Sequence, residues 1–218
     1  MKKQTIHEIK LLFSRYPELQ PLEEAVTECV QLIVDSYRNG GKLLVCGNGG
    51  SAADGLHIVG ELMKSFVLKR NIASELREKL IAQYPEDAEF YVKNLQGAMP
   101  AISLVNEVSL MTAFGNDQSA ELVFAQQVLG YGHDGDVLLA ISTSGNSANV
   151  IHAARVARVL GIKVISLTGE SGGNLKALSD VLLNVPNSCT YQIQELHLPV
   201  YHAICLALEQ ELYSGEKE

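Results

Sequence analysis

The sequence predicts an α/β protein, a three-layer α/β/α sandwich built on a five-stranded parallel sheet. Short apolar runs of roughly five residues recur along the chain, which is typical of parallel strands buried on both faces. Most of these runs end in Gly, Ser, Thr, Asn or Pro, and helical patterns lie between them. Strands that alternate with helices imply a parallel sheet between two helical layers.

The expected elements follow one another along the chain. Strands are expected at residues 42–46, 100–104, 136–142, 163–167 and 181–185. Helices are expected within residues 1–40, chiefly over 22–37, and again over 51–66, 146–160 and 194–212. The helix over 22–37 stops before Gly40 and Gly41, a common way for a helix to end. Pro199 lies within the last helical pattern and is expected to bend that helix or to start it.

Residues 69–97 depart from this alternation. They hold two helical patterns, around 74–82 and 86–95, parted by Tyr84 and Pro85. A few residues would be enough to connect a helix to the next strand. We therefore expect an inserted helical hairpin that covers a site or a subunit contact. The whole chain is otherwise expected to form a single domain over 1–218, with only the tail at 214–218 disordered.

Length and composition limit the function classes. A chain of 218 residues is long enough for one domain with a sizeable core. The net charge of −8 argues against a nucleic-acid partner, because phosphate backbones are bound by clustered Lys and Arg. No apolar run approaches the ~18 residues that a membrane span requires, so no membrane partner is expected. The charged N-terminus is not followed by the apolar segment of a signal peptide.

The 4 cysteines are scattered and form no C-x-x-C pair. In a chain of this size, this pattern indicates buried free thiols in a reducing compartment. We therefore expect a cytoplasmic protein.

The first candidate phosphate loop is Gly-Asn-Gly-Gly-Ser at 47–51, between the first strand and a helix. Glycines let the backbone approach a ligand closely, and the free N–H groups of a helix start attract anions. The loop matches neither the dinucleotide fingerprint nor a Walker A loop. The alternative interpretation is a tight turn with Ser51 as the helix N-cap.

The second candidate loop, at 142–147, carries more hydroxyl groups than a turn needs. Ser142, Thr143, Ser144 and Ser147 place four hydroxyls within six residues, between a buried strand and a helix. Such a set could surround a phosphate without any lysine. The alternative is a helix start with surplus caps, but a single hydroxyl would be enough for a cap.

Two further segments offer acid/base groups. His57 and Glu61 are four residues apart, so they share one face of a helix just after the first loop, near the expected ligand end of the sheet. An ordinary hydrogen-bonded pair is the alternative. Gln194 and His202 are eight residues apart, about 12 Å along an unbroken helix, so only long side chains could close on one ion. His197, a core or surface residue, is not included in the site.

Taken together, these segments resemble the sugar isomerase (SIS) domain family and, within it, the phosphoheptose isomerases. The matching segments are 41–51, His57-x-x-x-Glu61, Gly-Asn-Asp at 115–117, 135–150, Ser-Leu-Thr-Gly at 166–169, and Ile-Gln-Glu-Leu-His at 193–197 with His202. They follow the family's order over nearly the whole chain. The block at 135–150 is highly specific.

The resemblance implies the SIS fold and a role for each matching residue. A divalent metal, zinc in the family, would be bound, at least part of the time, by His57, Glu61, Gln194 and His202. Glu61 and His202 are also implied as base and acid. Substrate contacts are implied for Asn48, Gly49, Gly50, Ser51, Asn116, Asp117 and Gln194, and phosphate contacts for Ser142, Thr143, Ser144 and Ser147. The family also implies a homotetramer whose active sites draw on neighbouring subunits.

The chain departs from the family's pattern in three places. The insertion at 69–97 is absent from typical members. Tyr191 and Gln192 replace an Asp-Arg pair, which removes a carboxylate near the sugar hydroxyls. Ser65 stands where an arginine is common, with Lys64 and Lys69 nearby. These changes leave the isomerase core intact and leave the exact sugar open.

The expected reaction converts sedoheptulose 7-phosphate to D-glycero-D-manno-heptose 7-phosphate, for lipopolysaccharide or surface-glycan heptose. Glu61 would move a proton between two carbons through a cis-enediol, while His202 moves protons between the oxygens. A carboxylate bound tightly to zinc is a poor base. Either the metal is present only part of the time or Glu61 uses its second oxygen.

Two other functions compete with the isomerase. One is a non-catalytic SIS module like the replication-initiator-associating proteins, which lack the glutamate and the second histidine of the site. This chain keeps Glu61 and His202, which favours the enzyme. The other is a sugar-phosphate sensor, which would need a DNA-binding module that the sequence does not contain.

Overall fold

The centre of the molecule is a five-stranded parallel sheet with the strand order β2-β1-β3-β4-β5. A computed structural model describes residues 1–215; residues 216–218, in the tail expected to be disordered, lie outside the described part. The strands are β1 (Leu43–Gly47), β2 (Ala101–Ser103), β3 (Val137–Ile141), β4 (Lys163–Thr168) and β5 (Val181–Asn184). Each expected strand is confirmed to within one residue at either end.

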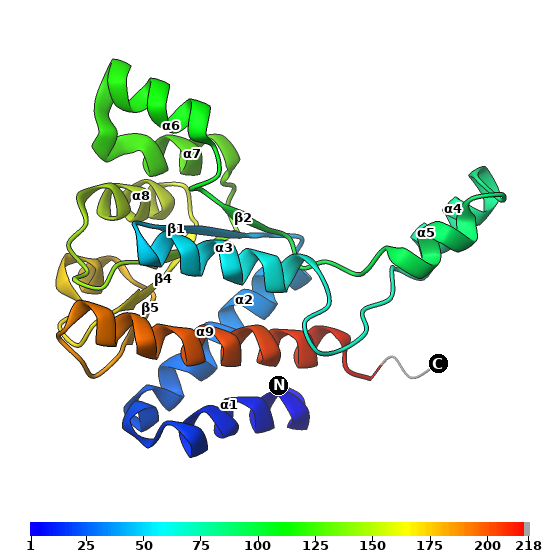
Figure 1. Cartoon of the computed structure of the whole chain (residues 1–218), viewed down its shortest axis with the longest axis horizontal. Helices are drawn as coiled ribbons and strands as arrows, with labels where there is room; N and C mark the ends of the chain where they lie inside the picture. Colours follow the sequence, from blue (N-terminus) through cyan, green and yellow to red (C-terminus); the bar gives the residue numbers. More distant parts are fainter. Residues whose placement is uncertain (216–218) are drawn as a thin grey trace.

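Helices cover both faces of the sheet, which confirms the three-layer architecture (Figure 1). One layer holds α1 (Lys3–Arg15), α2 (Glu23–Arg38), α3 (Gly50–Met63) and α9 (Thr190–Tyr213). The other holds α6 (Val108–Phe114), α7 (Val123–Tyr131) and α8 (Ala148–Val159). Four short helical turns lie between these elements. They are η1 (Pro17–Leu22), η2 (Gly115–Ser119, a π turn), η3 (Ala120–Leu122) and η4 (Gly173–Leu178).

The central strands are apolar throughout because each face of the sheet has its own core. In β1, Leu43 and Val45 pack into the core that includes α3 and α9, whereas Leu44 and Cys46 pack into the core that includes α7 and α8. All five residues of β1 are buried. This two-sided burial explains why the strands appear in the sequence as continuous apolar runs rather than as alternating patterns.

Two details of the helices differ from expectation. Helix α9 begins at Thr190 and continues through Pro199, so the prediction that Pro199 might start the helix was wrong. Helices α6 and α7 were not expected. The segment that contains them is divided by a π turn and a 3₁₀ turn, so no single helical period extends across it.

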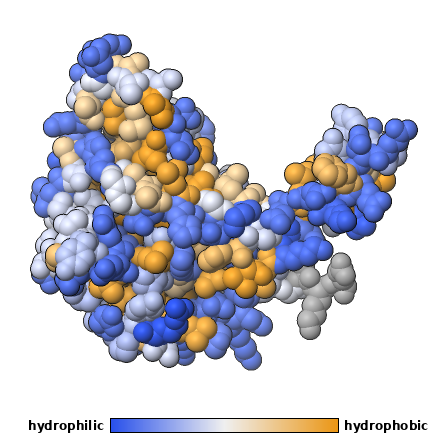
Figure 2. Space-filling view, viewed as in Figure 1, coloured by the Kyte–Doolittle hydropathy of each residue, from blue (hydrophilic) through white to orange (hydrophobic). Residues whose placement is uncertain are grey.

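The expected hairpin is present as α4 (Ser74–Gln83) and α5 (Ala88–Asn94), and it projects away from the body of the molecule (Figure 1). No residue of α4 is buried, and Ala88 is the buried residue of α5. Exposed apolar side chains are visible on it in Figure 2. The large hydrophobic side chains exposed in this segment are those of Leu76, Ile81, Tyr84, Phe90 and Leu95. The hairpin therefore presents an apolar surface to its surroundings.

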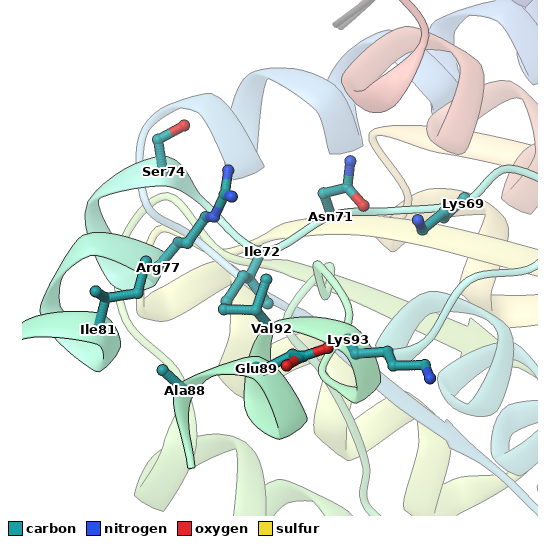
Figure 3. A pocket seen from close by; sticks show the side chains of 10 residues that line it. All are labelled: Lys69, Asn71, Ile72, Ser74, Arg77, Ile81, Ala88, Glu89, Val92 and Lys93. Carbon is teal, nitrogen blue, oxygen red and sulfur yellow. The ribbon is translucent and has the colours of Figure 1, made fainter. Parts of the chain in front are cut away.

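A groove of about 850 Å³ runs along the hairpin. Ile72 and Val92 line it, together with the cationic side chains of Lys69, Arg77 and Lys93 (Figure 3). The two ends of the hairpin meet at its base, where the Gly97 N–H donates to the Arg70 carbonyl oxygen at 3.0 Å.

Two absences in the described chain concern membranes and disulfides. Among the helices within residues 1–215, none combines the length and the apolar character needed to cross a bilayer. The cysteines are unpaired, as expected, and Cys29, Cys46 and Cys205 are buried.

His197 of α9 belongs to the core. Its side chain is fully buried, with Nε2 3.2 Å from the carbonyl oxygen of Thr168 at the end of β4. Burial lowers the pKa of His197 to about 4, although the hydrogen bond to Thr168 opposes this shift. The imidazole is therefore neutral in the folded protein near pH 7.

We expect His197 to make the fold sensitive to acid. An unfolded chain protonates this histidine near its ordinary pKa of ~6.5, before the folded chain does. The stabilisation is therefore complete above about pH 6.5 and is lost as the pH falls to about 4, by about 3 kcal/mol at most. Urea unfolding at several pH values will measure it. His197→Gln places a non-titrating amide nitrogen near Nε2 and should lose less stability in acid; an unchanged pH dependence would contradict this assignment.

Candidate active site

Helices α3 and α9 run side by side in the same direction, in a nearly constant register. The backbone at Gly50 lies against the Gln194 carboxamide, the His57 ring bonds to Tyr201, and the Phe66 N–H bonds to Glu209. Tyr201 lies 144 residues after His57 in the sequence, and Glu209 lies 143 residues after Phe66. The offset between paired residues is therefore nearly constant. This register brings two distant segments of the sequence together along their whole length.

The first loop is shaped by its glycines. Gly49 has a φ of +55°, and it is the N-cap of α3. A Cβ on Gly50 would lie 2.4 Å from Nε2 of Gln194, so a larger residue there would require the Gln194 side chain to move. The alternative interpretation, with Ser51 as N-cap, was wrong: Ser51 lies within the first turn of α3, and its side chain is buried.

The second loop holds its hydroxyls close together. Ser142 Oγ and Ser147 Oγ are 3.0 Å apart, and Ser144 Oγ accepts a hydrogen bond from the Asn146 N–H at 3.1 Å. Ser147 is the N-cap residue of α8, but its side chain caps no backbone N–H. Gly145 has a φ of +65°, and a Cβ there would lie 2.0 Å from the Gly172 carbonyl oxygen. The loop is thus fixed against its neighbour, while the Ser147 hydroxyl is not used for capping.

An amide pair joins the two loops. Asn48 and Asn149 exchange hydrogen bonds in both directions, each 2.9 Å long. Asn48 follows β1 and Asn149 lies in the first turn of α8, so the pair spans the carboxyl ends of the neighbouring strands β1 and β3. Ligands of such sheets bind at this edge. The two candidate phosphate loops therefore form one continuous polar surface.

The acid/base groups meet on the facing sides of α3 and α9. His57 Nε2 lies 3.3 Å from Glu61 Oε1, and the rings of His57 and His202 are perpendicular with centroids 5.0 Å apart. The Tyr201 hydroxyl and His57 Nδ1 share a hydrogen bond of 3.0 Å. Glu61 and His202, from opposite halves of the sequence, thus flank the same imidazole.

The surroundings keep His202 neutral. Burial lowers the pKa of His202, His57 lowers it further, and the Glu61 carboxylate opposes the shift. Its Nε2 atom is buried and has no hydrogen-bond partner in the structure. A neutral imidazole with an unused nitrogen can accept a proton, donate one or bind a cation.

A second carboxylate lies nearby. Burial raises the pKa of Asp54, although the Tyr201 hydroxyl and His57 oppose this shift. Burial and the charge of Asp54 raise the pKa of Tyr201 in turn. Tyr201 therefore remains a protonated phenol that orients the His57 ring.

Glu61 also has a cationic neighbour. Lys64 Nζ lies 2.8 Å from Glu61 Oε2, while the other carboxylate oxygen faces His57. The Lys64 side chain is 58% exposed, whereas that of Glu61 is 14% exposed. The carboxylate is therefore largely shielded from water and held from both sides.

The donor types suit a divalent metal. Imidazole nitrogen and carboxylate oxygen are common zinc ligands, and the Tyr201 contact to His57 is the kind that orients a ligating histidine. The unpartnered Nε2 of His202 fits the same role. Within residues 1–215, however, no three His, Cys, Asp or Glu side chains come close enough to hold a metal as they stand. Side-chain rotation would be needed to bring His57, Glu61 and His202 onto one ion.

Three predicted site residues lie apart from this cluster. The carboxamide of Gln194 lies against Gly50, about two turns of α3 before His57. Asn116 and Asp117 occupy the exposed π turn η2, where their side chains bond to each other at 2.9 Å. Within one chain, the structure does not bring these three residues to Glu61.

The two halves of the site are also separated along α3. Ser51 lies in the first turn of α3, whereas Glu61 lies in its last turn, about 15 Å further along the axis. The expectation that the His57–Glu61 pair lies near the ligand end of the sheet therefore does not hold for Glu61 within a single chain.

Sequence reasoning missed Asn149, Tyr201 and Asp54. Asn149 lies within the matching block at 135–150, and Tyr201 directly precedes His202, so both were adjacent to residues already selected. Asp54 is one turn before His57 on α3 and could have been found from that spacing.

Comparison with known proteins identifies the family and the fold. The family model described as "SIS domain" matches residues 6–100 and 96–169. The phosphoheptose isomerase of Geobacter sp. (strain M21) is 40% identical over 192 residues, covering 88% of this chain and 86% of that protein.

Solved structures agree. The phosphoheptose isomerase from Neisseria gonorrhoeae superposes with a TM-score of 0.72 at 35% identity, covering 94% of this chain and 95% of that one. The phosphoheptose isomerase from Francisella tularensis gives a TM-score of 0.70 at 31% identity, covering 94% and 92%. The chain is a phosphosugar isomerase that belongs to the SIS domain family and, within it, to the phosphoheptose isomerases.

Proposed function

We propose that the enzyme interconverts sedoheptulose 7-phosphate and D-glycero-D-manno-heptose 7-phosphate, in the biosynthesis of heptose for lipopolysaccharide or a surface glycan. One observation carries the proposal: Glu61 and His202 flank His57 on two parallel helices. The relatives named phosphoheptose isomerase support a heptose phosphate as the substrate. The unpaired cysteines support a cytoplasmic location.

The phosphate binds at the paired loops. The hydroxyls of Ser142, Ser147 and their neighbours donate to its oxygens, and the first N–H groups of α3 and α8 face the same edge of the sheet. No lysine is required in this arrangement. The bridge between Asn48 and Asn149 holds the two loops at a fixed distance.

Glu61 is the base of the isomerisation. It removes the proton from C1 of the ketose, the electron pair forms the C1–C2 double bond, and the C2 carbonyl oxygen takes a proton, which gives a cis-enediol. The O1 proton then leaves, C1 becomes the carbonyl carbon, and Glu61 returns its proton to C2. Low exposure of the Glu61 side chain keeps competing water away from the carboxylate.

His202 carries the proton between the two oxygens. Its lowered pKa leaves the imidazole neutral at pH 7, so it is able to donate to O2 and accept from O1. His57 lies between His202 and Glu61, and the bond between its Nδ1 and Tyr201 helps to orient the ring.

A divalent metal, zinc by analogy with the family, is proposed to bind His57, Glu61 and His202. When bound, it polarises the carbonyl of the substrate as a Lewis acid. Partial occupancy, or use of the second oxygen of Glu61 as the base, reconciles a ligating carboxylate with a catalytic one. Gln194 would join this set only if its side chain left Gly50.

A homotetramer with shared active sites is proposed as the working assembly. The separation of about 15 Å between Ser51 and Glu61 along α3 favours a site completed by a second subunit. The exposed Asn116–Asp117 pair is available to such a neighbour. The hairpin, interpreted as an insertion, would cover a subunit contact, because its apolar side chains have little to pack against in their own chain.

Turnover of sedoheptulose 7-phosphate by the purified protein tests the substrate. We expect an aldoheptose phosphate to form, detected by NMR. Glu61→Gln should lower kcat by about 10²–10⁴-fold, because it removes the base, while binding of the sugar phosphate survives. Glu75→Gln, an exposed carboxylate on the hairpin, is the control. Full activity of Glu61→Gln would reject the assigned role, and binding without any turnover by the wild type would reject the reaction.

Metal content tests the proposed zinc site. After dialysis against zinc and removal of the excess, the wild type should retain zinc, and His57→Ala and His202→Ala should each retain far less, because each loses one nitrogen ligand. Calorimetric titration of the metal-free protein with zinc measures the same loss as a weaker Kd. Equal retention by all three proteins would place the metal elsewhere.

Removing the hairpin tests its role in assembly. Arg70 and Gly97 already meet at its base, so residues 71–96 can be replaced by a short Gly-Ser link with little change to the body. We expect the shortened protein to fold but to form smaller oligomers, as measured by light scattering after gel filtration. An unchanged mass would show that the hairpin does not serve a subunit contact.

A further inference from the structure

An ion pair lies deep between the two helices that carry the site. Arg70 Nε is 2.6 Å from Glu209 Oε1, and the two side chains are 0% and 1% exposed. Removing two charges from water is costly, and apolar residues of similar size often stabilise a core equally well. The attraction between the two charges alone therefore does not explain why the pair is there.

Arg70 holds the end of α3. Its Nη1 donates to the carbonyl oxygen of Leu62 at 2.7 Å, and its Nη2 donates to that of Glu61 at 3.0 Å. These are among the last carbonyls of α3, which have no partner within the helix. A cation at this end also matches the helix dipole. The guanidinium thus donates a hydrogen bond to the backbone carbonyl of Glu61, the residue that we assign as the base.

Glu209 holds the segment that follows α3. Its carboxylate accepts the N–H groups of Phe66, Val67 and Leu68, at 2.8, 2.9 and 2.9 Å. These bonds and Arg70 outweigh burial and lower the pKa of Glu209, so it is a carboxylate at neutral pH. The Phe66 ring in turn lies 5.6 Å from the His202 ring.

Glu209 and His202 lie on the same helix. They are seven residues apart on α9, which is about two turns, so they lie roughly on one face. A continuous set of contacts therefore connects Glu61 to His202. The backbone carbonyl of Glu61 accepts a hydrogen bond from Arg70, and Arg70 forms an ion pair with Glu209. Glu209 lies on the helix that carries His202.

We propose that Arg70 and Glu209 are positioning residues that set the distance between the base and the acid, Glu61 and His202. The inference rests on the proposed function of those two residues. Neither member of the pair touches the substrate. They act by fixing the end of α3, and hence the Glu61 carboxylate, relative to α9. A misplacement of about 1 Å between reacting groups can cost about 10²-fold in rate.

The main test replaces the pair with apolar residues of similar volume, Arg70→Met with Glu209→Leu. The double variant leaves no unpaired charge in the core. It also removes the partners of five backbone groups, so a cooperative urea transition must first establish that it folds. We expect its kcat for sedoheptulose 7-phosphate to fall by about 10²-fold while KM changes little, because the phosphate loops are untouched. Arg70→Lys keeps a charge but cannot serve both carbonyls, and should also lower kcat.

Arg38→Met is the matched control. Arg38 pairs with Glu211 at 2.9 Å, two residues beyond Glu209 on α9, but it does not bond to α3. Loss of this pair should alter stability and leave kcat unchanged. A purely structural role for Arg70 would instead make kcat follow stability in every variant.

The outcomes separate the two proposals. Wild-type kcat in either the double variant or Arg70→Lys, with Glu61→Gln inactive, would overturn the positioning role and leave the isomerase intact. A wild type without turnover would overturn both. Should the double variant not fold, Arg70→Lys decides alone: a lowered kcat at unchanged KM, with Arg38→Met normal, supports the positioning role.

Discussion

The parallel packing of α3 against α9 is the constraint on which the site depends. Three contacts with nearly the same sequence offset fix the register of α3 against α9: at Gly50, at His57 and at Phe66, just beyond the end of α3. Three different kinds of contact occur in succession along this seam: a glycine against an amide, a pair of aromatic rings, and a buried carboxylate. A shift of one residue in the register between α3 and α9 would break all three contacts.

The packing of α3 against α9 also explains why the candidate site contains residues from both halves of the sequence. The α3 side follows β1 directly, whereas α9 is the last helix of the described chain. A parallel sheet places the starts of both helices at the same edge, since both follow the carboxyl ends of strands. The fold therefore brings His57 and His202 together.

Much of the fold could be predicted from the sequence, because strands buried on two faces leave unmistakable apolar runs. The runs at 136–142 and 163–167 are examples, and both are strands. The two candidate phosphate loops were selected for their glycines and hydroxyls at strand ends, and the structure confirms that both lie at one edge of the sheet. Helices α6 and α7 were missed because propensity and period give little signal across short helices broken by tight turns.

The site was less predictable than the fold, for a physical reason. Residue spacing predicts which side chains share one helix face, as for His57 and Glu61, but not the register between helices that are distant in sequence. The register between α3 and α9 places Tyr201 against His57. It places Gln194 against Gly50 rather than beside Glu61. A buried pair such as Arg70 and Glu209 gives no periodic signal at all.

The closed base of the hairpin has a consequence for the history of the protein. A segment whose two ends already touch is an appendage, and its length and composition can change without rerouting the chain through either core. Lineages could therefore gain, lose or replace this arm while the catalytic helices stay as they are. Differences in sequence among relatives would then be concentrated in the hairpin. New binding partners could be acquired there with little effect on the active site.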